Sequence, residues 1–233
     1  MTVMEESLRV PVADVVLDAD VATPDDPRGV VLFAHGSGSS RHSPRNRYVA
    51  AHLQAAGLAT VLADLLTPAE ERLDSVTREL RFDITLLADR MTELVDWAVV
   101  TDWTGPGPPT EGARTITPDG RSGSPPIGLF GASTGAAAAL VAAARRPTTV
   151  RAIVSRGGRP DLAGDALPKM HQPTLLIVGG NDTVVIELNR QAVRLVGGEA
   201  RLEIVPGASH LFEESGALEE VARLAADWFV TRL

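Results

Sequence analysis

The chain has 233 residues, a length that suits one α/β domain with a single core. Its formal net charge of −8 disfavours binding to nucleic acids and anionic membranes, and the absence of cysteine excludes disulfides, thiolate metal ligands and a cysteine nucleophile. No run approaches the roughly 20 apolar residues of a membrane-spanning helix, and residues 1–9 carry no signal-like apolar stretch. We therefore expect a cytoplasmic protein with one domain over 1–233; the choice between monomer and homodimer stays open.

Short apolar runs alternate with helical patterns along the chain, which predicts a mostly parallel sheet covered by helices on both faces. Residues 8–21 alternate loosely between apolar and polar and predict one or two edge strands. Residues 30–34 form a continuous apolar run, typical of a strand buried on both faces. Ser43 followed by Pro44 predicts the start of a helix, which ends before a further strand over 58–63.

The rest of the chain continues this alternation after one long interruption. Apolar residues spaced three and four apart predict a long helix over 78–99. Almost half of segment 104–126 is Gly or Pro, and because it has little apolar surface to bury, we expect a flexible surface insertion. The remaining patterns predict strands over 127–130, 150–155, 174–178 and 201–205, and helices over 134–146, 185–196 and from about 216 onward. Only about 18 residues separate the strands at 155 and 174, too few for a sizeable lid domain there.

The strongest motif is Gly131-Ala132-Ser133-Thr134-Gly135, which matches G-x-S-x-G between a predicted strand and a predicted helix. In this context the serine occupies a strained turn that exposes its hydroxyl at the carboxyl edge of the sheet. The flanking glycines are required because a Cβ at either position would meet the neighbouring strand or helix. The motif predicts a catalytic nucleophile at Ser133, and the alternative is a Gly/Ser turn that only begins the helix.

A serine hydroxyl needs a base, and His210 is the candidate because it follows the last predicted strand and reaches the same edge as Ser133. The base needs an acid to orient it, and Asp182 follows the strand over 174–178 at that edge. Asp161, in the loop after the preceding strand, is a rival for the acid. The other histidines fit less well. His52 lies in a predicted helix and His171 precedes a strand, at the wrong edge, while His35 and His42 come before the serine in the chain.

The loop His35-Gly36-Ser37-Gly38 follows the predicted strand over 30–34 and predicts an oxyanion hole. We expect the backbone N–H groups of Thr134 and Ser37 to be its donors, with His35 holding the loop. The same loop permits another interpretation, a truncated dinucleotide fingerprint with Asp64 as the ribose-binding acid of an oxidoreductase. Arg41 stands at the third glycine position of that fingerprint, which weakens this interpretation.

Two pairs of arginines lie beside the predicted carboxyl ends of strands: Arg41 and Arg45 after the glycine loop, and Arg156 and Arg159 after the strand over 150–155. The guanidinium fork matches a carboxylate or phosphate, so these side chains are candidate substrate-binding residues for an ester with an anionic group. The alternative is that they form structural salt bridges or lie in solvent.

The chain resembles the dienelactone hydrolase-like branch of the α/β-hydrolase superfamily over nearly its whole length. The resemblance lies in the glycine loop, the G-x-S-x-G motif, Asp182 and His210, which follow one another in this order. The resemblance implies an α/β-hydrolase fold with a mostly parallel sheet of about seven or eight strands, no metal, no organic cofactor, and hydrolysis through an acyl-enzyme. Dienelactone hydrolases proper use a cysteine nucleophile, whereas this chain has Ser133, which favours a general ester hydrolase. The segment 104–126 looks like an insertion relative to the family.

The sequence therefore predicts a serine hydrolase of a small-molecule carboxylic ester, lactone or thioester. An alternative from another class is a non-catalytic binding or scaffold protein that kept the fold and lost turnover.

Overall fold

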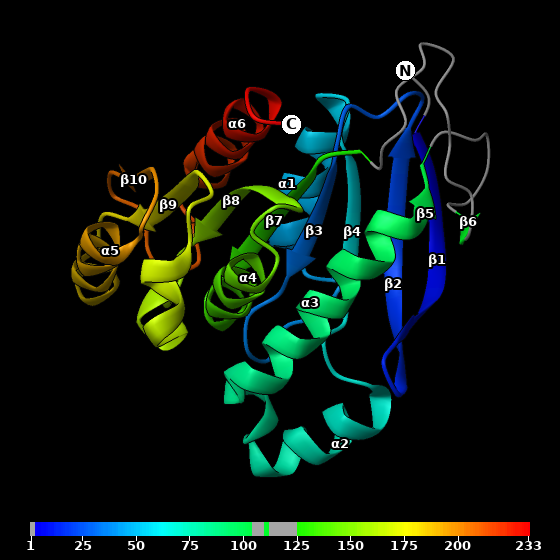
Figure 1. Ribbon diagram of the computed structural model, residues 1–233. Coiled ribbons are helices and arrows are strands. Elements are labelled where there is room, and N and C mark those ends of the chain that lie inside the picture. The colour runs from blue at the N-terminus through cyan, green and yellow to red at the C-terminus, as the bar shows by residue number, and fades with distance from the viewer. Residues whose placement is uncertain (1–2, 104–109, 112–124) are drawn as a thin grey trace.

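The computed structural model describes residues 3–103, 110–111 and 125–233, and it contains one eight-stranded sheet with helices on both faces (Figure 1). The strand order is β1-β2-β4-β3-β7-β8-β9-β10. The strands are β1 (Val3–Val12), β2 (Val15–Pro24), β3 (Val30–Ala34), β4 (Ala59–Ala63), β7 (Ile127–Ala132), β8 (Val150–Arg156), β9 (Thr174–Gly179) and β10 (Ala200–Val205). This arrangement confirms the predicted mostly parallel sheet.

The direction of the strands decides where the loops meet. β1 and β2 form an antiparallel hairpin, and β2 pairs with β4 in antiparallel fashion. From β4 to β10 every neighbouring pair is parallel. The carboxyl ends of these parallel strands therefore lie at one edge of the sheet, and the loops that leave this edge carry the candidate catalytic residues.

The core consists of two layers, one on each face of the sheet. Successive side chains of a strand point to opposite faces, so Val30 and Leu32 of β3 join one buried cluster while Val31 and Phe33 join the other. The first cluster is covered by α3 (Ile84–Val100) and α4 (Thr134–Arg145), and the second by α1 (Pro44–Ala55) and α6 (Ala217–Val230). Ser43 caps α1 as predicted, with its Oγ accepting from Asn46 N–H.

The prediction of a single helix over 78–99 is wrong at the amino end of that range. A separate helix, α2 (Pro68–Thr77), comes first; Arg78 then adopts a left-handed backbone with φ of 60°, and α3 begins only at Ile84. Thr67 and Glu70 form a reciprocal capping box at the start of α2, because each side chain accepts a hydrogen bond from the other residue's backbone N–H.

The edge strands β1 and β2 extend beyond the predicted range of 8–21, and the elements after α3 follow the predicted boundaries closely. The 3-10 segment η2 (Pro160–Lys169) fills the connection between β8 and β9, and α5 (Thr183–Leu195) joins β9 to β10. The segment 104–126, predicted as a surface insertion, lies outside the described residues apart from its last two positions and β6 (Thr110–Glu111), which pairs with β5 (Thr101–Asp102). Among the described residues, no helix is long and apolar enough to span a membrane.

Candidate active site

Ser133 lies in a strained turn between β7 and α4. Its φ of 51° and ψ of −121° are unusual for a residue with a side chain, a conformation that costs on the order of 1–3 kcal/mol and persists only where the surroundings impose it. Two backbone hydrogen bonds hold the turn against the end of β8 and the segment that follows it. Ser133 N–H donates to the carbonyl of Arg156 at 3.2 Å, and Arg159 N–H donates to the carbonyl of Ser133 at 3.1 Å. This geometry matches the predicted nucleophile elbow.

Two glycines allow the elbow to form. A Cβ on Gly131 would collide with the backbone of Ala136, and a Cβ on Gly135 would collide with the carbonyl groups of Ala34 and His35. The end of β3 therefore lies directly against the first turn of α4. This close approach brings the glycine loop, residues 35–38, beside Ser133.

His210 and Asp182 are joined by a hydrogen bond of 2.6 Å between Nδ1 and Oδ2. An ionised carboxylate only accepts hydrogen bonds, so Nδ1 is the donor of this bond, and in the neutral imidazole Nε2 is then the acceptor. Asp182 is the more buried partner, with a side chain 15% exposed against 40% for His210. The pair has the geometry of a general base and its orienting acid.

The loops that carry this pair are joined to each other by hydrogen bonds. Asn181 donates twice to the histidine loop, from its backbone N–H to the carbonyl of Ala208 at 2.9 Å and from Nδ2 to the carbonyl of Gly207 at 2.7 Å. Ser209 N–H donates to a carboxylate oxygen of Glu214 at 3.0 Å, and this hydrogen bond lowers the pKa of Glu214. The position of His210 is therefore set by its neighbours in two loops.

Ser133 and His210 both contact the segment that ends β8. Gly157 has φ of +52°, and a Cβ there would lie 3.3 Å from the carbonyl oxygen of His210 and 3.4 Å from its Cε1. The preceding residue, Arg156, accepts the hydrogen bond from Ser133 N–H. Between the described residues no hydrogen bond links Ser133 Oγ to His210. Such contacts are often long in ligand-free hydrolases and shorten when substrate binds.

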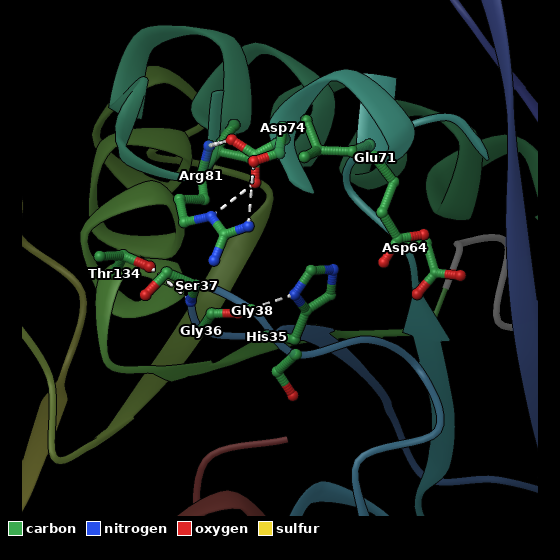
Figure 2. A pocket seen from close by; sticks show the side chains of 12 residues that line it. His35, Gly36, Ser37, Gly38, Asp64, Glu71, Asp74, Arg81 and Thr134 are labelled. Carbon is green, nitrogen blue, oxygen red and sulfur yellow. Dashed lines mark hydrogen bonds and ion pairs between the residues drawn. The ribbon is translucent and has the colours of Figure 1, made fainter. Parts of the chain in front are cut away.

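The glycine loop differs in one respect from the predicted oxyanion hole. Ser37 N–H, expected to be an open donor, instead donates to Oγ1 of Thr134 at 2.9 Å (Figure 2). Thr134 is the first residue of α4, so its own N–H has no acceptor within the helix. The side chain of Thr134 therefore occupies the N–H of Ser37, and the N–H of Thr134 is the other predicted donor.

His35 has the structural role predicted for it. Its Nε2 accepts from Leu65 N–H at 3.2 Å, and its Nδ1 donates to the carbonyl of Gly36 at 3.1 Å. Asp64, the acid of the oxidoreductase interpretation, is held by Arg41, whose backbone N–H donates to Oδ1 at 2.7 Å and whose guanidinium pairs with Oδ2. Its carboxylate is already bound within the protein, which is a physical reason against ribose binding.

A small cavity of about 40 Å³ lies between the glycine loop and α2 (Figure 2). Thr134 lines it, and so do Asp74 and Arg81, which sequence patterns did not single out because their segment reads as helix. Arg81 Nε donates to Asp74 Oδ2 at 2.5 Å. Burial opposes ionisation of Asp74, but the hydrogen bonds from Arg81 outweigh it and hold the pKa of Asp74 below its usual value.

The four candidate substrate-binding arginines are not equivalent. Arg41 is paired with Asp64 and lies 3.4 Å from Asp20, so its charge is already balanced. Arg159 donates to both carboxylate oxygens of Asp161, at 2.8 and 2.7 Å. For these two candidates the contacts fit the alternative interpretation, that they form structural salt bridges. The same contact argues against Asp161 as the orienting acid.

The other two arginines have weaker partners or none. Arg45 lies 3.6 Å from an exposed carboxylate, Glu213, and Arg156 has no acidic partner among the described residues.

Comparison with known proteins agrees with this fold. The family model described as the dienelactone hydrolase family matches residues 17–230. A dienelactone hydrolase from Anabaena variabilis has 53% sequence identity and a TM-score of 0.88, with all of both chains covered. Est1E from Butyrivibrio proteoclasticus is 15% identical with a TM-score of 0.73, over 97% of this chain and 98% of that one, and it shows the fold alone.

A protein of Mycobacterium tuberculosis, provisionally named a phosphoribosyl transferase, is 53% identical over 229 residues. The match covers 98% of this chain but 47% of the relative, so the chain spans about half the length of the curated relatives it matches. The family match covers most of the chain and contains the elbow, the glycine loop and the His210–Asp182 pair. This chain belongs to the dienelactone hydrolase family and has the α/β-hydrolase fold of that family's hydrolases.

Proposed function

We propose that the protein is a serine hydrolase that cleaves a small carboxylic ester, lactone or thioester through an acyl-enzyme on Ser133. The observation that carries the proposal is the strained backbone of Ser133 at the sheet edge where His210 is bonded to Asp182. Strain of this kind is retained at functional sites, and the hydrogen-bonded pair supplies the base that a serine hydroxyl needs.

In the first half of the proposed reaction, Ser133 Oγ attacks the carbonyl carbon while His210 Nε2 accepts the hydroxyl proton. Asp182 stabilises the imidazolium that forms. The tetrahedral intermediate collapses by breaking the bond to the leaving group, at the oxygen of an alcohol or the sulfur of a thiol. His210 returns the proton to this leaving group. In the second half, His210 takes a proton from water, whose oxygen attacks the acyl carbon. The second tetrahedral intermediate then collapses by breaking the bond to Ser133 Oγ, His210 gives its proton to Oγ, and the acid leaves.

The negative charge of each intermediate requires backbone donors, and Thr134 N–H and Ser37 N–H are the proposed pair. The hydrogen bond from Ser37 N–H to Thr134 Oγ1 must then give way to the oxyanion. A charge-assisted hydrogen bond is roughly twice as strong as a neutral one, so this exchange is favourable once the charge develops. Thr134 would therefore hold the Ser37 donor until the substrate takes it.

A fluorophosphonate probe tests the proposal directly. We expect stoichiometric labelling of the wild-type protein at Ser133, a burst of nitrophenol from 4-nitrophenyl butyrate, and neither in Ser133→Ala. Ser75→Ala, which removes an exposed hydroxyl on α2, is the matched control and should behave as wild type. A folded wild-type protein that neither labels nor releases nitrophenol would contradict the proposal and favour the scaffold alternative.

The name phosphoribosyl transferase belongs to relatives of about twice this length. The proposal for this chain rests instead on the hydrolase family match and on the contacts around Ser133.

A further inference from the structure

Asn189 is a fully buried amide on α5. Its exposed fraction is 0%, and the other buried residues of this helix are apolar: Val185, Ile186 and Ala192. The buried stripe of a surface helix usually consists of apolar side chains. An amide taken out of water into such a stripe needs hydrogen-bond partners, because burial without them costs free energy. The partners of Asn189 therefore indicate what this side chain does.

The Nδ2 atom of Asn189 donates to two carbonyl oxygens. One belongs to Val185, about one turn earlier in the same helix, at 2.8 Å. The other belongs to Gly158, 31 positions away in the chain, at 3.0 Å. The first bond is local, whereas the second joins α5 to the chain that leaves β8. We call residues 156–159, the end of β8 and the three residues after it, the bridge segment.

The bridge segment holds the proposed nucleophile. Ser133 N–H donates to the carbonyl of Arg156, and Arg159 N–H donates to the carbonyl of Ser133. Gly158 lies between these two contacts along the chain. It is packed so closely that a Cβ there would lie 1.9 Å from Ser155 Oγ. A displacement of the Gly158 peptide would therefore move the residues that hold the turn at Ser133.

The same helix holds the proposed base. Asp182 is the cap residue of α5, and it accepts the hydrogen bond from His210. Asn189 comes seven residues later, about two helical turns, so both side chains lie on one side of α5. The ring of His210 lies against the bridge segment, since a Cβ on Gly157 would be 3.4 Å from its Cε1. One helix thus contacts both His210 and the bridge segment.

We propose that Asn189 is a positioning residue that sets the distance between Ser133 and His210 by binding the bridge segment to α5. This inference rests on the proposed function and deepens it. Ser133 is bound to the bridge segment, and His210 is bound to α5 through Asp182. The hydrogen bond from Asn189 to Gly158 joins these two parts. Catalysis is sensitive to such a joint, because a remote mutation that displaces a reacting group by about 1 Å can cost about a hundredfold in rate.

Asn189→Leu removes the amide and keeps a buried side chain. We expect the rate constant of the nitrophenol burst from 4-nitrophenyl butyrate to fall by roughly ten- to a hundredfold. The ester concentration that half-saturates the burst should change by less than about twofold, because substrate binding is not affected. The rate of fluorophosphonate labelling at Ser133 should fall by the same factor as the burst. All rates are measured at a temperature where circular dichroism shows every variant folded.

Asn189→Ser separates the two hydrogen bonds and tests the inference if the leucine variant does not fold. A serine hydroxyl in a helix bonds to the carbonyl four residues earlier, here that of Val185. The shorter side chain does not reach Gly158. We therefore expect Asn189→Ser to slow the burst and the labelling as Asn189→Leu does.

Gln172→Leu is the matched control. Gln172 is also a buried amide, and its Nε2 donates to the carbonyl of Ala143 at 2.8 Å. It precedes β9, whereas Asp182 follows that strand, so Gln172 lies at the opposite edge of the sheet from the candidate site. We expect Gln172→Leu to lower the Tm as the Asn189 variants do and to keep the wild-type burst and labelling rates.

Slow chemistry in both Asn189 variants, with wild-type rates in Gln172→Leu, would support the inference. Wild-type rates in either Asn189 variant would overturn it. So would an equal loss of rate in Gln172→Leu at a similar Tm, because rate would then follow stability alone. Failure of the proposed function is distinguishable, since the wild-type protein itself would then not label at Ser133, and the inference would fall with it.

Discussion

The backbone N–H of Ser37 and the side-chain oxygen of Thr134 lie 2.9 Å apart, joined by a hydrogen bond between residues 97 positions apart in the chain. The bond connects the glycine loop after β3 to the first turn of α4. Thr134 follows the proposed nucleophile, Ser133. It would supply one donor of the proposed oxyanion hole through its own N–H and hold the other donor, Ser37 N–H, through its side chain.

Thr134→Val keeps the shape of the side chain and removes its hydroxyl. We expect kcat to fall by about tenfold with a smaller change in KM, because the Ser37 N–H loses the contact that positions it and an oxyanion donor is worth roughly 10²–10³ in rate. Thr134→Ser restores the hydroxyl and should recover most of the rate. Steady-state kinetics on 4-nitrophenyl butyrate measure both variants. An unchanged or faster Thr134→Val would mean that the hydroxyl competes with the substrate for Ser37 N–H.

Asp182→Asn tests the orienting acid. An asparagine at this position favours the wrong tautomer of His210 and cannot balance its charge, so we expect kcat to fall by roughly 10³–10⁴-fold with little change in Tm. Asp161→Asn is the control, because Asp161 bonds to Arg159 and not to the histidine. The assignment is wrong if the second variant loses activity and the first does not.

The pair Asp74–Arg81 predicts a dependence of stability on pH. The pKa of Asp74 is lower in the folded protein than in the unfolded chain, so the folded state gains stability from its ionisation above the unfolded pKa of about 4 and loses that gain as the pH falls through the folded value. We expect Asp74→Asn to melt at a lower temperature than wild type at pH 7, and the difference to shrink as the pH falls below about 4. Thermal unfolding across this range measures it, and a constant difference would refute the assignment.

The capping box of α2 makes a smaller prediction. Thr67→Ala removes the side-chain acceptor for Glu70 N–H and should lower the free energy of unfolding by about 1 kcal/mol. Ser75→Ala changes an exposed hydroxyl within the same helix and should fall within about 0.5 kcal/mol of wild type. Urea unfolding curves compare the two; equal midpoints would show that α2 contributes little to cooperative unfolding.

Much of the fold could be predicted because its signals are local. Continuous apolar runs such as 30–34 mark buried parallel strands, and Ser43 followed by Pro44 marks a helix start. The division of 68–100 into α2, a short 3-10 turn and α3 was missed, since the apolar spacing around Leu80 continues the pattern of α3. The Thr67 capping box was the signal that could have found α2.

The sequence by itself predicted the order of the strands and of the helices other than α2. It also singled out Ser133, His210 and Asp182 as candidates, because each depends on a motif and on which end of a strand it follows. Only the tertiary structure decided which arginines are free. Arg41, Arg159 and Arg156 occupy similar places in the sequence, yet among the described residues Arg41 and Arg159 contact a carboxylate and Arg156 does not. Packing brings the two side chains of an ion pair together, so the partner cannot be predicted from the local sequence. The same holds for the hydrogen bond from Ser37 N–H to Thr134.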